Sequence, residues 1–188
     1  MIKFLILSLL CVSALAVSGN KGACRAQNYT NVDVDFSNRY LGRWYNIYVS
    51  ASMPFQYRDD LCNLDEYSID KYGNMRALYK GMHANQKVTE FLQQVKKVGP
   101  GHLKIKFFSL QPIGANYEVP YINDDYTVSV VVGCNAFGFL GQSDIWIITR
   151  SYNPDPLEVQ KALDFIKQAG FDDSDLVPVS TKGCAKIK

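Results

Sequence analysis

Eight short segments rich in aromatic and β-branched residues follow one another through the middle of the chain. They cover residues 44–49, 64–69, 75–82, 87–98, 102–110, 117–122, 126–133 and 144–149. Segments of this kind, spaced by about 8–12 residues, are typical of antiparallel β-sandwiches and barrels. The pattern therefore predicts an all-β domain built on eight antiparallel strands.

The alternation within these segments indicates how the sheet is arranged. Apolar and polar residues take strict turns along residues 102–107, which gives that strand one dry face and one wet face. In residues 75–81, Met75, Ala77 and Tyr79 share one face, whereas Arg76 and Lys80 share the other. A sheet with a single water-facing side is expected to close around its own interior as an up-and-down barrel.

One helix is predicted after the last strand. The run Asn153-Pro154-Asp155-Pro156 supplies stop and start signals, and Gly170 marks the end of the helix. Between them lies an apolar stripe near the helical period, formed by Leu157, Ala162, Leu163, Phe165 and Ile166. Residues 177–179 favour a short final strand.

The N-terminus has the three-part layout of a secretory signal peptide. A positively charged start at Lys3 precedes the apolar residues 4–17, and small residues predict cleavage after Ala16 or Ser18. We therefore expect a signal peptide over residues 1–18, one domain over residues 19–188, and a secreted, extracellular protein. An N-terminal anchor is the alternative, although the apolar stretch is shorter than the about 20 residues of a membrane span.

The net charge and the cysteines limit which partners, disulfides and metal sites are expected. A formal net charge of +2 gives no electrostatic reason to expect nucleic acid binding. Four cysteines outside the leader predict two disulfides in an oxidising compartment, with three connectivities open: Cys24, Cys62, Cys134 and Cys184. No pair has CxxC spacing and neither histidine lies near a cysteine, so no metal site is expected. Asn28 begins an N-glycosylation triplet.

Three motifs resemble those of the lipocalins, and within them the branch of apolipoprotein D, insect bilin-binding proteins and crustacyanins. The first is Gly42-Arg43-Trp44, the second is Asn123-Asp124-Asp125-Tyr126, and the third is Ile147-Ile148-Thr149-Arg150. The second matches the family pattern only at its aspartate. The resemblance covers nearly the whole chain after the leader. It implies an eight-stranded antiparallel barrel with one C-terminal α-helix packed outside.

The resemblance also assigns the barrel closure and the disulfides. Gly42, Trp44, Asp124 and Arg150 would close one end, with the Arg150 guanidinium stacked on the Trp44 indole. The alternative is a core tryptophan and an unrelated surface arginine. The implied disulfides are Cys24–Cys134 and Cys62–Cys184, each tying a tail of the chain to the barrel.

A ligand site follows from strand parity together with the resemblance. An eight-stranded barrel has room for side chains or for one small ligand. The expected ligand-binding residues are Tyr67, Met75, Ala77, Tyr79, Ile105, Phe107, Trp146 and Ile148. Ordinary core packing is the alternative for each of them. We expect His83 and His102 to lie at the rim or surface rather than to hold haem.

The sequence favours a binding protein over an enzyme. It contains no G-x-S-x-G elbow, no phosphate-cradling loop and no H-E-x-x-H motif. The expected function is extracellular binding and transport or storage of a small hydrophobic molecule such as a bilin, retinoid, carotenoid, sterol or fatty acid. No cofactor is expected to be required, although biliverdin or another hydrophobic ligand would be a suitable occupant.

Two alternative functions remain open. One is a pigment-binding chromoprotein, and the other is a protein that displays loops to a partner and needs no ligand. The apolar residues 136–141 predict weak membrane or protein contact through the loop that contains them. We expect a monomer or a small homo-oligomer.

Overall fold

The computed structural model describes residues 29–51, 60–107, 111, 114–134 and 143–187. Several expectations lie outside these residues: the signal peptide over 1–18, the glycosylation of Asn28 and the contact through residues 136–141. The Cys24–Cys134 pairing also lies outside them, because Cys24 is not described and Cys134 is described only in its backbone. Among the described residues, no helix is long and apolar enough to cross a membrane.

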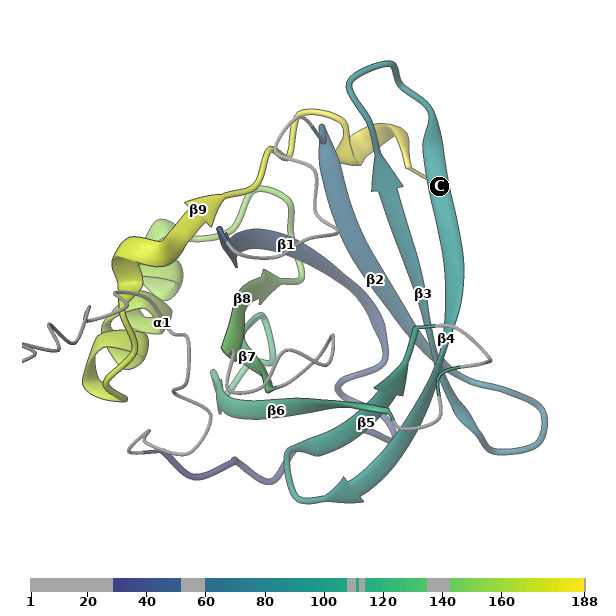
Figure 1. The fold of residues 1–188 in the computed structure, drawn as a ribbon, viewed down its shortest axis with the longest axis horizontal. Helices are drawn as coiled ribbons and strands as arrows, with labels where there is room; N and C mark the ends of the chain where they lie inside the picture. The colour runs from purple at the N-terminus through teal and green to yellow at the C-terminus, as the bar shows by residue number, and fades with distance from the viewer. Residues whose placement is uncertain (1–28, 52–59, 108–110, 112–113, 135–142, 188) are drawn as a thin grey trace, which may run out of the picture.

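All eight expected strands are present and form a closed antiparallel barrel, which confirms the predicted fold class (Figure 1). They are β1 (Gly42–Ser50), β2 (Cys62–Ile69), β3 (Met75–Met82), β4 (Val88–Gly99), β5 (His102–Lys106), β6 (Ala115–Ile122), β7 (Val128–Cys134) and β8 (Ser143–Thr149). Each strand pairs with the next in the chain, and β1 pairs with both β8 and β2. The additional β1–β2 pairing closes the sheet on itself.

Two strands are shorter than the sequence pattern predicted. Strand β5 ends at Lys106, because the backbone N–H of Phe107 donates to the Gln111 side chain at 2.9 Å instead of to a neighbouring strand. Strand β7 begins at Val128 rather than at Tyr126, because Tyr126 adopts a left-handed conformation with φ 58°. The Asn123 carboxamide holds this turn by accepting from the N–H groups of Thr127 and Val128.

One helix lies outside the barrel, as expected (Figure 1). Helix α1 (Pro156–Gln168) begins after Asp155, whose carboxylate accepts from the N–H of Leu157 at 2.9 Å. Its buried face consists of Val159, Ala162 and Ile166. Leu157 does not belong to the packed stripe, contrary to the prediction, since it lies in the first turn and is 72% exposed.

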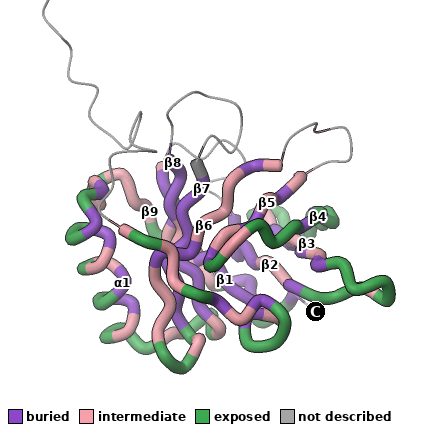
Figure 2. The backbone as a smooth tube through the Cα atoms, turned by 90° about the horizontal axis from the view of Figure 1, so that it is seen from below, coloured by how far each residue is buried: buried purple, intermediate pink, exposed green. Residues whose placement is uncertain are grey.

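The chain ends in short elements on the outer surface. The expected final strand is β9 (Leu176–Pro178), which pairs with β1, and it follows the short 3₁₀ helix η1 (Asp173–Asp175). A second 3₁₀ helix, η2 (Cys184–Lys186), follows near the C-terminus. Figure 2 shows that buried residues concentrate along the strands, whereas α1 and the strand connections carry many exposed positions.

The barrel wall separates three apolar clusters. An inner cluster contains Trp44, Tyr67 and Ile105, and an outer one lies between α1 and strands β7 and β8. A second outer cluster covers β1–β3 and contains Leu64, Met82 and Cys184. The helix and the C-terminal segment therefore make parts of the outer wall apolar as well, which leaves the inner wall free to carry polar groups.

Candidate functional site

One end of the barrel is sealed by Arg150 and Trp44. The Trp44 side chain is fully buried, and the guanidinium carbon of Arg150 lies 4.0 Å from the centre of its ring. The same guanidinium donates to the carbonyl oxygens of Leu41 at 2.8 Å and of Arg43 at 3.0 Å. Stacking and hydrogen bonding by one planar group are what arginine offers and lysine does not. The expected pairing of these two side chains is therefore present.

The other two residues assigned to closure act through the backbone. Gly42 has φ +91°, a left-handed conformation that residues with a Cβ rarely adopt, so the G-x-W glycine provides the backbone conformation beside Arg150. Asp124 contributes its carbonyl oxygen, which accepts from Arg39 at 2.6 Å. The side chain that organises this turn is Asn123, which sequence reasoning missed although Asn is a common turn former.

The predicted ligand-binding residues share the inner face of the barrel. Five of them are buried in the inner cluster, and two pack against it with part of their surface accessible: Tyr67, Met75, Ala77, Ile105 and Ile148, then Phe107 and Trp146. The strand register agrees, since Trp146 lies opposite Val131 and Ile148 opposite Ser129. The structure brings these residues to one wall; whether they contact a ligand stays a prediction.

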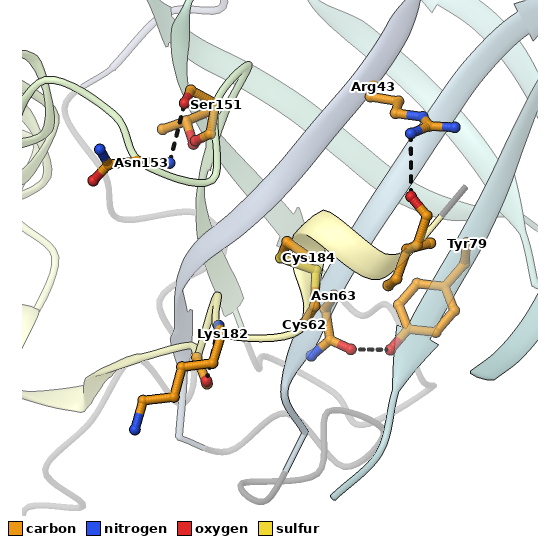
Figure 3. Close-up of a disulfide and its surroundings, with 11 residues drawn as sticks. Arg43, Cys62, Asn63, Tyr79, Ser151, Asn153, Lys182 and Cys184 are labelled. Carbon is orange, nitrogen blue, oxygen red and sulfur yellow. Dashed lines mark hydrogen bonds between the residues drawn. A yellow bond between two sulfur atoms is a disulfide. The ribbon is translucent and has the colours of Figure 1, made fainter. Parts of the chain in front are cut away.

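Tyr79 lies on the same wall and is held by neighbours on both sides. Its hydroxyl is hydrogen bonded to the side-chain carboxamide of Asn63 at 2.9 Å, and Figure 3 shows the two side chains joined by this bond. Its ring stacks on Phe91 from β4, with the ring centres 4.6 Å apart. Phe91 faces inward by register yet is 36% exposed, so the wall near Tyr79 remains accessible to solvent.

Two tyrosines not singled out from the sequence complete an inner hydroxyl chain. The hydroxyls of Tyr40 and Tyr117 lie 2.7 Å apart, and the Tyr67 hydroxyl donates to that of Tyr117 at 2.9 Å. Burial raises the pKa of all three phenols well above the usual value. They therefore remain neutral hydrogen-bonding groups above the sealed end. Tyr117 shares the alternating face of its strand with Ala115 and Val119, which is a signal that parity could have provided.

The inner wall also carries a carboxyl and an amide that the sequence analysis did not assign. Asp65 lies opposite Trp44 on β1 and opposite Tyr79 on β3. Burial raises the pKa of Asp65 to about 7, while the neighbouring Asn46 amide opposes this rise. Asn46 is 2% exposed, and its amide acts on the Asp65 carboxyl as a hydrogen-bond donor. The missed signal was parity, because Asp65 lies two residues before Tyr67.

Accessibility differs along the barrel axis. At the sealed end Tyr40 and Trp44 are fully buried. Farther along, a group of inward-facing residues keeps accessible surface: Asp65, Tyr79, Phe107, Tyr117 and Trp146. The interior therefore presents aromatic walls, phenol hydroxyls and the Asp65 carboxyl to solvent or to a small molecule. In the described parts of the chain, no group of three or more metal-ligating residues occurs.

Both histidines make hydrogen bonds to neighbouring side chains. The Nδ1 atom of His83 lies 2.7 Å from the Asp60 carboxylate, and its Nε2 lies 2.8 Å from the Thr89 hydroxyl. These bonds tie together the ends of β2, β3 and β4 at the rim. His102 contacts the Asn116 side chain at 3.2 Å. Haem ligation by His83 would require one of these bonds to break.

The Cys62–Cys184 disulfide is present on the outside of the barrel (Figure 3). It joins residues separated by 122 positions, with the Cα atoms 5.0 Å apart. It fastens the C-terminal segment over Leu64 and Met82. The disulfide therefore covers the outer face of the same strand whose inner face carries Asn63 and Asp65.

A sealed end, a partly accessible inner wall and an external helix together define a barrel of the kind that encloses small molecules. The family described as Lipocalin-like domain matches residues 32–181. Apolipoprotein D of Oryctolagus cuniculus is 25% identical over 161 residues, which are 84% of this chain and 81% of that protein. The chain belongs to the lipocalin family, whose members bind small hydrophobic molecules.

Solved structures agree on the fold. The major allergen Per a 4 from cockroaches superposes with a TM-score of 0.66 at 18% identity, covering 85% of this chain and 96% of that one. Lobster apocrustacyanin A1 superposes with a TM-score of 0.60 at 20% identity, covering 81% and 89% of the two chains. At these identities the superpositions support the barrel fold and do not identify a bound molecule.

Proposed function

We propose that this protein is an extracellular carrier that binds one small hydrophobic molecule inside the barrel. The observation that carries the proposal is the contrast between the sealed end and the inner wall above it. Trp44 is fully buried, whereas Trp146 and Tyr117 face the interior with accessible surface. Aromatic surface left accessible on a concave wall favours an apolar occupant.

Secretion and the class of occupant belong to the same proposal. The leader-like residues 1–18 and the disulfide support an oxidising, extracellular setting. Bilins, retinoids, carotenoids, sterols and fatty acids all have an apolar body of suitable kind, and biliverdin would make the protein coloured. We propose a binding protein rather than an enzyme, acting as a monomer or small homo-oligomer, with residues 136–141 available for a weak membrane or protein contact.

The test is a titration of the secreted protein with retinol, biliverdin, cholesterol and oleic acid by isothermal calorimetry. We expect at least one to bind and Trp146→Ala to weaken that binding about tenfold, since removing an aromatic ring from a binding wall costs about 1.4 kcal/mol or more. Tyr72→Ala removes an aromatic that is 77% exposed in a turn, and it serves as the matched control.

Failure of every ligand to bind would contradict the carrier function, whereas binding that Trp146→Ala leaves unchanged would contradict only the contact between the ligand and Trp146. If no ligand binds, the display of loops to a protein partner becomes the favoured function. The absorption spectrum and the mass spectrum of material copurified from the native source distinguish a pigment-binding chromoprotein from a carrier of colourless lipid. Visible absorbance that disappears on extraction identifies the former.

A further inference from the structure

We propose that the barrel interior selects apolar molecules that carry a cationic nitrogen, with Asp65 pairing with that nitrogen and Asn46 supporting the carboxylate. The inference rests on the proposed function, because it requires that the interior takes up a ligand at all. It adds a head-group preference that an aromatic wall alone does not provide. A fatty acid or another carboxylate would be the disfavoured ligand.

The position of Asp65 supports this role. The strand register aligns it with Trp44 on one side and with Tyr79 on the other, so its side chain lies on the inner face between two aromatic residues. It retains accessible surface there. Its charge raises the pKa of Tyr67 and of Tyr117, which shows that the carboxyl lies near the inner hydroxyl chain. A ligand that reaches the tyrosines therefore meets Asp65.

The position of Asn46 is a second observation that supports a ligand with a polar group. It is an inward-facing amide on β1, and the register places it opposite Ile148. The residue is 2% exposed, so the amide is shielded from solvent beside the Asp65 carboxyl. Its amide lowers the pKa of Asp65 against the effect of burial. Asn46 is thus placed to stabilise the carboxylate when a cation arrives.

The charges around the interior favour a cation. Asp65 has no ion-pair partner among the described residues, and Arg150 is held at the sealed end by Trp44 and backbone carbonyls. Lys97 lies exposed near Phe36, with its nitrogen 5.7 Å from the ring centre. Other titratable groups that face the interior or its rim, among the described residues, are acidic, phenolic or already hydrogen bonded: Tyr40, Tyr67, Tyr79, Tyr117, Asp144, Asp60 and His83.

Binding of a cation should depend on pH through Asp65. Because burial raises the pKa of this carboxyl to about 7, the ionised fraction increases about tenfold between pH 6 and pH 8. An alkylamine stays protonated over that range, since its pKa is close to the about 10.4 of lysine. Amine affinity should therefore rise about tenfold, whereas carboxylate affinity should fall.

The experiment compares three probes that differ only in the head group: n-decylamine, n-decanol and n-decanoic acid. Each is titrated by calorimetry into the secreted protein at about pH 6 and about pH 8. We expect decylamine to bind about tenfold more tightly at the higher pH and decanol to be unaffected. In Asp65→Asn the amine should lose this pH dependence while decanol binding persists. Glu66→Gln, one position along β2 with its side chain outside beside Arg43, should behave as wild type.

The outcomes separate the inference from the function on which it rests. If decanol or decanoic acid binds but decylamine has no advantage at the higher pH, the head-group preference is refuted and the carrier function stands. The same conclusion follows if Asp65→Asn leaves the amine profile unchanged. If none of the three probes binds to the wild-type protein, the carrier function and the inference are both overturned.

Discussion

Asp65 should contribute a decrease in the free energy of unfolding of the protein as pH rises. The folded protein holds the Asp65 proton until about pH 7, whereas the unfolded chain releases it near the ordinary value of 3.8. Between those values the folded state binds more protons than the unfolded state. Stability from this group is therefore fully present below about pH 4 and is lost progressively up to about pH 7.

The magnitude follows from the two pKa values. The difference between about 7 and 3.8 corresponds to about 4 kcal/mol at most. Asp65 keeps some contact with solvent in the barrel interior, which reduces the penalty. We therefore expect Asp65→Asn, which is neutral at every pH, to gain about 2–4 kcal/mol over wild type between pH 4 and pH 8.

The assay is urea unfolding of wild type and Asp65→Asn with intact disulfides, followed by tryptophan fluorescence at several pH values. Other titrating groups cancel in the difference between the two proteins. Glu66→Gln provides the matched control, because it removes a carboxylate from the outer face of the same strand. A wild-type to Asp65→Asn difference that stays constant within about 0.5 kcal/mol from pH 4 to pH 8 would refute the buried, proton-holding state of Asp65.

Two further predictions concern the sealed end and the C-terminal segment. Arg150→Lys keeps the charge but loses the planar fork that stacks on Trp44 and bonds several carbonyls, so unfolding by urea should show a loss of about 2–4 kcal/mol. Arg39→Lys at an exposed position should cost under about 1 kcal/mol, and equal losses in the two variants would contradict the special role of Arg150. Replacing both Cys62 and Cys184 by serine opens a loop of 122 residues and should lower stability by about 4 kcal/mol, seen as a drop in the midpoint of thermal unfolding; an unchanged midpoint would mean that the C-terminal segment is held without the bridge.

The strand pattern predicted the barrel well because side chains along a strand alternate between its two faces. Every second residue of each strand therefore faces the barrel interior. Along β3 the inward set Met75, Ala77 and Tyr79 follows directly from parity. The G-x-W glycine and the terminal arginine also marked the sealed end, since their roles depend on local conformation and on one planar side chain. These signals predict on which face of the barrel wall each residue lies.

The pattern failed where another part of the chain covers the outside of the barrel. Along β2 the outward residues Cys62 and Leu64 are buried under the C-terminal segment, while the inward residues Asn63 and Asp65 are polar. Hydrophobicity alone would assign these faces the other way round. A cover supplied by residues more than a hundred positions away is not visible in a local window, so the inner carboxyl was overlooked.

The same covering explains how the barrel tolerates a carboxyl inside. Burial of Leu64 and Met82 outside β2 and β3, together with the disulfide, stabilises this wall from its outer side. The inner side need not contribute as much apolar burial, and it can hold Asp65 and Asn46 although burial of polar groups costs stability. A bound cation would offset that cost by stabilising the ionised carboxyl, so ligand binding and stability at neutral pH should be coupled. Polar groups that reduce stability yet lie beside accessible aromatic surface fit the proposed ligand with a cationic nitrogen.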